Sequence, residues 1–265
     1  MQRFIHGLFI MNKKTVISFI WIAFFFCYVE GNATLSVERD SLLYNVQTKI
    51  FDAFMASFQD NSPKQLLELE TKLKEYPVQN QLTDYWRAYT WYYVAIHYIK
   101  SKDREACSKT VDDAIGFLEK TENKNSETYA LLAYLQNFSI QFVSGMEAAT
   151  VSTKIKQNAE TALKLDSANI RAWFVMASND FYTPAAFGGG AKCEEYLLKA
   201  VSLNEQPVAN PHLPNWGKRE AYTMLIGFYV SKNDYPKARE YLNEALRLYP
   251  DDYTLNQYVE SLKEK

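Results

Sequence analysis

The sequence predicts an all-α fold in which antiparallel helix hairpins stack into a solenoid with a capping helix at the C-terminus. Three observations support this prediction. Apolar residues recur at intervals of three and four along most of the chain, which is the period of an amphipathic helix. A pattern of aromatic and small residues returns several times in the same order. The 265 residues include only nine Gly and eight Pro, few for a loop-rich β fold.

The first 33 residues have the pattern of a secretory signal peptide. Two lysines precede the apolar run 16–29, and small residues follow it and end at Ala33. The run has about 14 residues, whereas a membrane-spanning helix needs roughly 20. We therefore expect cleavage after Ala33 and export to the periplasm or the surroundings. Met11 fits as the true start, because it places the two lysines directly behind it.

Two alternatives remain open for this segment. The chain could be a lipoprotein acylated at Cys27, although Phe24–Phe26 before it match poorly the small residues that such signals prefer. It could also keep residues 1–33 as an uncleaved anchor. Removing them leaves Cys107 and Cys193, and two cysteines so far apart do not make a disulfide scaffold.

The stretch 36–80 predicts a first helical hairpin of divergent sequence. Apolar residues from Leu35 to Phe58 recur with the helix period, and residues 60–63 interrupt them. A second leucine-rich helix then ends before Pro77. This pair has the length of the later hairpins but lacks their aromatic and small residues, as terminal repeats often do.

Four hairpin repeats follow, with a final helix behind them. The last repeat carries the pattern most fully: Tyr222-x2-Leu225-x3-Tyr229-x8-Ala238-x3-Leu242-x2-Ala245-x4-Pro250. Laid back along the chain, this spacing gives repeats at about 82–120, 125–167, 169–204 and 217–250, with a capping helix over 252–264. Extra residues lie near Gly145, at Gly188–Gly190 and in the proline-containing linker 204–216. Residues 34–265 are thus predicted to form one domain.

This spacing resembles the tetratricopeptide repeat (TPR), a helix–turn–helix unit of about 34 residues. The resemblance covers residues 82–252 well and 36–80 only by helix length. It implies a right-handed superhelix of about ten to eleven helices, in which the first helix of each hairpin lines a concave face. It also implies a protein-interaction scaffold that binds an unidentified protein or peptide on that face, without catalysis.

The resemblance places an aromatic set on the concave face. Its flanking positions include Tyr89, Tyr92, Tyr134, Phe138, Arg171, Phe174 and Phe181. Relatives that grip acidic C-termini of chaperones use several Lys, Asn and Arg residues there, whereas this set has one cation. An aromatic groove would suit an apolar peptide or a flat ligand. The same rings could equally belong to the core between helices, and both interpretations stay open.

Phe187-Gly188-Gly189-Gly190 is the most unusual local feature. Consecutive glycines permit positive φ and a close approach of the backbone to a ligand or a helix. No Lys-Ser/Thr follows, so this is no Walker loop. The segment is either a structural turn or a binding loop. As a binding loop, together with Trp216 of the linker, it would make the protein a periplasmic small-ligand-binding protein, which is the alternative function.

The sequence carries no pattern of catalytic or metal-binding residues. Cys107 and Cys193 occupy the small-residue position that Ala238 fills in the last repeat, which favours packing over reactivity. His97 and His212 lie in no metal-binding spacing. The formal net charge is −2 and no basic block is present, so nucleic-acid binding has no electrostatic support. We therefore expect no enzyme activity, no cofactor and no metal.

Overall fold

The computed structural model describes residues 42–205 and 210–263. The predicted signal peptide and Cys27 lie outside the described residues. The described residues from 45 onward form one compact unit, and the fold given below is that of this unit. The described ranges contain eleven α-helices and no β-strand. None of the helices described is both long and apolar enough to span a bilayer.

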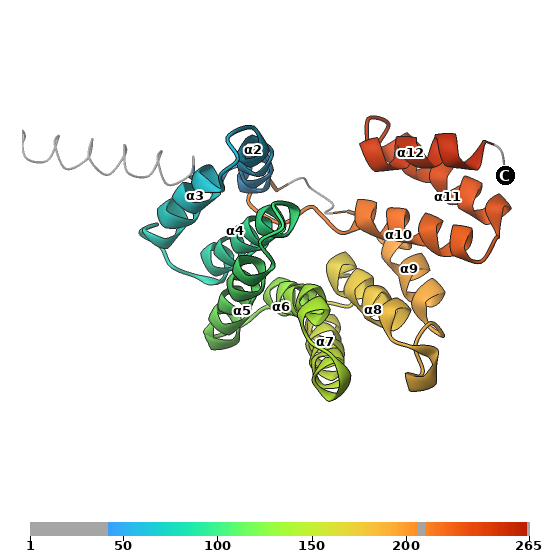
Figure 1. Cartoon of the computed structure of the whole chain (residues 1–265), viewed down its shortest axis with the longest axis horizontal. Helices are drawn as coiled ribbons and strands as arrows, with labels where there is room; N and C mark the ends of the chain where they lie inside the picture. Colours follow the sequence, from blue (N-terminus) through green and yellow to red (C-terminus); the bar gives the residue numbers. More distant parts are fainter. Residues whose placement is uncertain (1–41, 206–209, 264–265) are drawn as a thin grey trace, which may run out of the picture. The chain divides into compact units, whose positions relative to one another are not determined.

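The helices follow one another with short connections, apart from the linker after α9 (Figure 1). They are, in chain order, α2 (Val46–Gln59), α3 (Lys64–Lys74), α4 (Gln81–Lys100), α5 (Arg104–Lys120), α6 (Ser126–Ser139), α7 (Gly145–Leu165), α8 (Ile170–Tyr182), α9 (Cys193–Ser202), α10 (Lys218–Ser231), α11 (Tyr235–Leu248) and α12 (Tyr253–Leu262). Two 3₁₀ turns, η1 (Ile140–Phe142) and η2 (Ala185–Phe187), lie within the connections.

Neighbouring helices pair into hairpins, and the hairpins pack side by side (Figure 1). Helix α4 packs on α5, α6 on α7, α8 on α9, and α10 on α11. The first helices also contact one another, α4 with α6, α6 with α8, and α8 with α10. This arrangement confirms the predicted all-α stack of helix hairpins.

Small side chains fill the places where the two helices of a hairpin cross. Cys107 packs with Ala95 and Val111, and Cys193 packs with Ala177, all fully buried. Both cysteines are free, and burial raises the pKa of Cys107 to about 11 and that of Cys193 to about 12. The thiols are therefore neutral near neutral pH, and both side chains pack among buried apolar residues, as expected of small core residues.

Asparagine N-caps begin the first helices of three successive hairpins, α4, α6 and α8. The Asn80 side chain accepts hydrogen bonds from the backbone N–H groups of Leu82 and Thr83, at 2.9 and 3.2 Å. Asn125 and Asn169 cap α6 and α8 in the same way. Each cap satisfies N–H groups that a helix start leaves free, so the first helices begin in register and present equivalent positions to one face.

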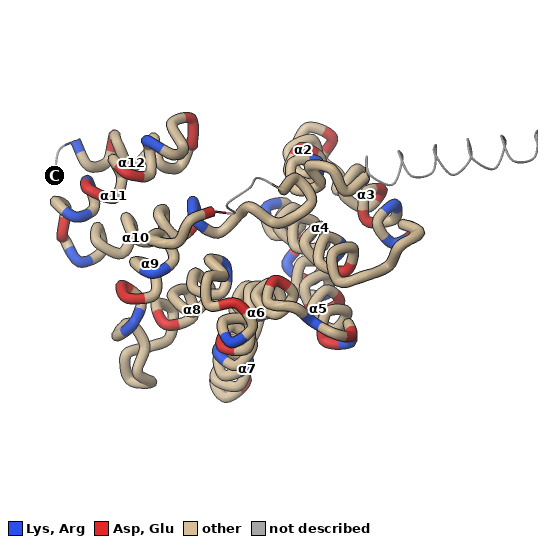
Figure 2. Tube along the Cα trace, turned by 180° about the vertical axis from the view of Figure 1, so that it is seen from behind, with Lys and Arg blue, Asp and Glu red and all other residues tan. Residues whose placement is uncertain are grey.

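Helix α12 closes the C-terminal end of the stack. It packs on α11, and its Leu255 and Leu262 are buried in the same apolar cluster as Leu225 of α10. A helical stack needs such a cap, since its last hairpin would otherwise expose an apolar face. Figure 2 shows acidic and basic residues scattered along the described trace rather than gathered into one block of either sign.

Candidate binding site

The described part of the chain just before α10 crosses the face formed by the first helices of the hairpins. We call residues 210–217 the strap. The backbone oxygen of His212 accepts a hydrogen bond from Trp86 Nε1 of α4 at 2.9 Å. The Asn215 N–H donates to Gln47 Oε1 of α2, also at 2.9 Å. The strap is therefore attached to the first two hairpins, although its residues follow the third repeat in sequence.

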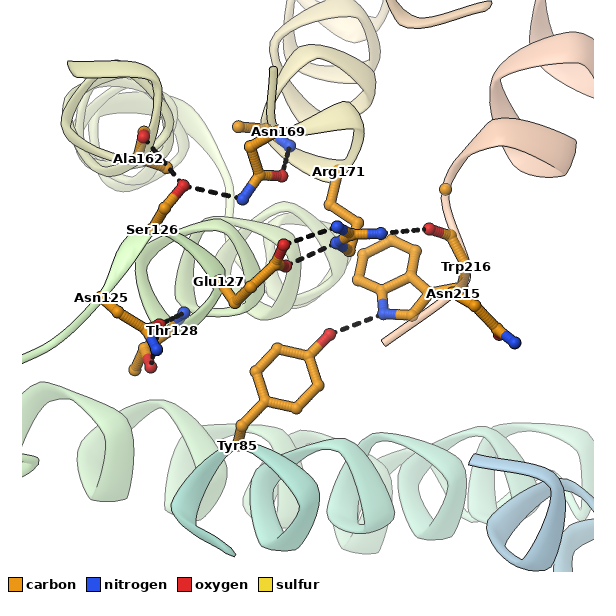
Figure 3. Close-up of polar contacts among 12 residues, drawn as sticks. Tyr85, Asn125, Ser126, Glu127, Thr128, Ala162, Asn169, Arg171, Asn215 and Trp216 are labelled. Carbon is orange, nitrogen blue, oxygen red and sulfur yellow. Dashed lines mark hydrogen bonds and ion pairs between the residues drawn. The ribbon is translucent and has the colours of Figure 1, made fainter. Parts of the chain in front are cut away.

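Trp216 anchors the strap among the tyrosines of this face (Figure 3). Its indole is 6% exposed, and its Nε1–H donates to the Tyr85 hydroxyl at 2.7 Å. The ring stacks on Tyr89, with centroids 5.9 Å apart and an interplanar angle of 19°, and lies 4.7 Å from Tyr134. Tyr89 and Tyr134, which the sequence placed in a groove, are thus covered by the chain's own tryptophan.

Arg171 clamps the end of the strap to α6 (Figure 3). Its Nε and Nη2 donate to both carboxylate oxygens of Glu127 at 2.5 Å, and its Nη1 donates to the Trp216 carbonyl at 2.8 Å. Burial works against the charge of Arg171, but Glu127 outweighs it and the pKa of Arg171 is raised. Only 7% of Arg171 is exposed. The predicted ligand-facing cation is therefore occupied by contacts within the chain.

Tyr92 and Phe138 extend the aromatic surface beyond Trp216. The Tyr92 and Tyr134 hydroxyls share a hydrogen bond of 2.6 Å, and the Tyr92 and Phe138 rings meet edge to face at 5.4 Å. Burial raises the pKa of both tyrosines, so their hydroxyls stay protonated near neutral pH. The Tyr92 and Phe138 rings are half-buried, and Phe138 also packs on the apolar cluster of Ala95, Cys107 and Val111.

An open cleft lies further along the same face, between α8, α10 and the start of α12. We call it the aromatic cleft; its volume is about 530 Å³. Two of the predicted residues, Phe174 and Phe181, line it. The full lining is Phe174, Ser178, Phe181, Tyr182, Arg219, Glu220, Thr223, Met224, Gly227, Phe228, Asp252, Thr254 and Tyr258. Small-molecule sites commonly measure about 300–1,000 Å³, so the aromatic cleft has the size of a ligand site.

The charged residues of the aromatic cleft are paired with one another. Arg219 donates to Glu220 at 2.6 Å and to Asp252 at 3.0 Å. The Thr223 hydroxyl donates to the Arg219 carbonyl, and the Ser178 hydroxyl accepts from Asn137. Contacts offered to a ligand therefore come mainly from the rings.

Tyr258 of α12 enters the aromatic cleft beside Gly227 of α10. A Cβ atom at position 227 would lie 2.9 Å from the Tyr258 hydroxyl, so the missing side chain makes room for it. Tyr258 was not among the residues predicted from the sequence, because the last helix was interpreted only as a cap. The signal was a glycine inside α10, where it costs about 0.5–1 kcal/mol relative to alanine.

The loop 187–190 is held by hydrogen bonds between residues at its two ends. The Gly190 N–H donates to the Asp180 carbonyl at 2.8 Å, and the Lys192 N–H donates to the Asp180 carboxylate at 2.9 Å. Gly188 and Gly190 have φ values of 84° and 79°. Phe187 is 80% exposed. The two cavities lined by Trp216 include no residue of this loop, so the structure does not bring the loop and Trp216 together.

Gly189 and Gly188 give a matched pair of substitutions. A Cβ at Gly189 would lie 1.8 Å from the Thr183 carbonyl oxygen, whereas a Cβ at Gly188 meets nothing within 4 Å. Gly189→Ala should lower the free energy of unfolding by about 3 kcal/mol through overpacking, and Gly188→Ala by about 1 kcal/mol through its positive φ. Urea denaturation measures both. Equal effects would show that the loop relaxes around the new methyl group.

No group of three or more His, Cys, Asp or Glu residues in the described part of the chain is placed to hold a metal ion. His97 is buried, and its Nδ1 lies 2.9 Å from the Ser57 hydroxyl. The buried imidazole of His97 thus has a hydrogen-bond partner within the chain.

Comparison with known proteins bears on the fold. No protein-family model and no curated protein matches the chain. The structure is similar to that of TTC0263, a thermophilic TPR protein in Thermus thermophilus, with 14% identity, a TM-score of 0.53, and coverage of 80% of this chain and 98% of that one. It is also similar to the HusA haemophore from Porphyromonas gingivalis, with 21% identity, a TM-score of 0.51, and coverage of 71% and 94%. The described residues therefore have the TPR-like helical-repeat fold that the sequence predicts.

Proposed function

We propose that this protein is an exported, non-catalytic binding protein whose aromatic cleft captures a flat, largely apolar molecule of tetrapyrrole size. The observation that carries the proposal is the cleft itself. Five aromatic rings from α8, α10 and α12 border a cavity of about 530 Å³. They are Phe174, Phe181, Tyr182, Phe228 and Tyr258. Rings arranged around one cavity favour a flat partner, which they contact by stacking and edge-to-face packing.

The pairing of the cleft's charges supports an uncharged buried portion in the ligand. Arg219 is held between Glu220 and Asp252, so a ligand carboxylate would have to break one of these pairs. Burying a charge without a partner is costly. A tetrapyrrole would place its apolar macrocycle against the rings and leave its carboxylates toward water.

Two further observations agree with this ligand class. The similar structure from Porphyromonas gingivalis is described as a haemophore. The basic, apolar and small order of residues 1–33 supports export, with the Cys27 lipoprotein as the alternative. A protein outside the cytoplasm with an aromatic cleft is suited to collecting a scarce apolar molecule from its surroundings.

Protoporphyrin IX is the probe that tests the proposal. Titration into the purified mature chain should quench its tryptophan fluorescence in a saturable manner. Phe181→Ala should weaken binding about tenfold or more, because a buried phenyl ring contributes about 1.5–3 kcal/mol. Phe58→Ala on α2 provides the control, since Phe58 is 43% exposed and does not line the cleft. Absence of saturable binding, or equal weakening by both substitutions, would contradict the proposal.

A second candidate function is the protein-interaction scaffold that the repeat pattern implies. The observation that favours it is an exposed apolar stripe on α2. Phe51, Met55 and Phe58 are 45%, 49% and 43% exposed and lie three or four residues apart. This spacing places them on one side of the helix, where a partner helix could pack. Changing all three to serine should abolish partner capture from an envelope extract while porphyrin binding persists, and capture that persists would exclude this stripe.

A further inference from the structure

The Tyr258 hydroxyl differs from the charged groups of the aromatic cleft and from the hydroxyls of Thr223 and Ser178. Arg219, Glu220 and Asp252 are paired, and the hydroxyls of Thr223 and Ser178 are hydrogen-bonded. Within the described part of the chain, the Tyr258 hydroxyl makes no hydrogen bond, although its ring is half-buried. A phenol in this position has its donor and its lone pairs available to a ligand.

Gly227 leaves room for the Tyr258 hydroxyl beside α10, at a cost in the stability of that helix. Gly227 lies in the interior of α10, and any side chain there would press on the Tyr258 oxygen at 2.9 Å. Alanine at 227 would favour the helix but move the ring. Packing alone does not require a hydroxyl at position 258, because the ring of phenylalanine would fill nearly the same space.

Two phenols lie at the aromatic cleft, those of Tyr258 and Tyr182. Burial, together with the neighbouring Tyr182, raises the pKa of Tyr258, so the free side chain is a neutral phenol. Tyr182 is 69% exposed. Of the two, the Tyr258 side chain is the more buried, and its hydroxyl lies against α10.

We infer that Tyr258 is an axial ligand for the ferric ion of an iron-loaded tetrapyrrole in the aromatic cleft. This inference rests on the proposed function. Phenolate oxygen is an established ligand of ferric haem iron. On binding, the phenol O–H bond breaks and its oxygen replaces the hydroxide that ferric iron carries in water; the phenol proton leaves with that hydroxide as a water molecule. Iron remains ferric throughout, so no oxidant or reductant is required. The rings would hold the macrocycle, and Tyr258 would select the metal-loaded form.

Haemin and metal-free protoporphyrin IX separate this inference from the proposed function. Wild type should bind haemin at least tenfold more tightly than protoporphyrin IX and show a phenolate-to-iron charge-transfer band. Tyr258→Phe should lose that preference and the band, while its affinity for protoporphyrin IX stays within twofold of wild type. Tyr253→Phe is the matched control, because Tyr253 lies on the same helix, is 76% exposed and does not line the cleft.

Each remaining outcome is decisive. If wild type binds protoporphyrin IX but prefers haemin by less than tenfold, the axial-ligand role is wrong while the proposed function stands. The role is also wrong if Tyr258→Phe keeps the band, or if Tyr182→Phe removes it instead. If wild type binds neither molecule, the proposed function and the inference fail together.

Discussion

Trp216→Ala should lower the free energy of unfolding by about 4 kcal/mol. The indole is 6% exposed, stacks on Tyr89 and Tyr134, and donates a hydrogen bond to Tyr85. Alanine would leave a cavity among these rings and a hydroxyl without its donor. It would also free the strap, which is the part of the chain that joins the last repeat to the first hairpins.

Urea denaturation followed by circular dichroism at 222 nm measures this loss. Leu213→Ala is the control on the same strap, because Leu213 is 39% exposed and should change stability by less than about 0.5 kcal/mol. Trp216→Phe should fall between the two, since it keeps a ring and loses the Nε1–H. If Trp216→Ala and Leu213→Ala were equally mild, the strap would not contribute to the fold.

Arg171→Met should cost about 3 kcal/mol, because it leaves the Glu127 carboxylate largely buried without its partner. Glu127 and Arg171 side chains are 24% and 8% exposed, and two hydrogen bonds of 2.5 Å join them. The Trp216 carbonyl would lose its donor as well. The effect combines an unpaired charge with a loosened strap.

The double variant Arg171→Met with Glu127→Leu distinguishes these two causes. Replacing both members of a buried pair by apolar residues of similar size is often nearly neutral. We therefore expect the double variant to be more stable than Arg171→Met alone, with a remaining deficit of about 1 kcal/mol for the lost bond to Trp216. A double variant less stable than either single variant would contradict this account of the clamp.

The helices could be predicted from the sequence because their signals are local. Asn80, Asn125 and Asn169 each precede a first helix, and the small residues at positions such as Cys107 and Cys193 repeat at a fixed offset. Capping and hairpin packing act over a few turns, so a single repeat carries most of the information.

The packing of the strap and the side of the aromatic cleft formed by α12 could not be predicted in this way. Trp216 and Tyr85 are 131 residues apart in the chain, and nothing in the repeat pattern relates them. The sequence marked Trp216 as an aromatic residue in a polar linker, but not the face on which it packs. It placed Arg171 and Tyr89 on the concave face and left open whether the rings there form a groove or the core between helices; the structure places both residues against Trp216. Tyr258 was missed because only first helices were considered for the concave face.

The face formed by the first helices of the hairpins is divided into two parts. One part, around Tyr85, Tyr89 and Tyr134, is covered by the chain's own strap. The other, around Phe174 and Phe181, remains open as the aromatic cleft. Ligand capture in the open part requires no rearrangement of the strap.

A crystal structure of the protein with protoporphyrin IX would show whether the ligand enters the aromatic cleft while the strap stays in place. We expect the macrocycle in the aromatic cleft, in contact with Phe174, Phe181 and Tyr258, and Trp216 Nε1 still hydrogen-bonded to the Tyr85 hydroxyl. A macrocycle lying between Tyr89 and Tyr134, with the indole of Trp216 displaced, would contradict this division of the face.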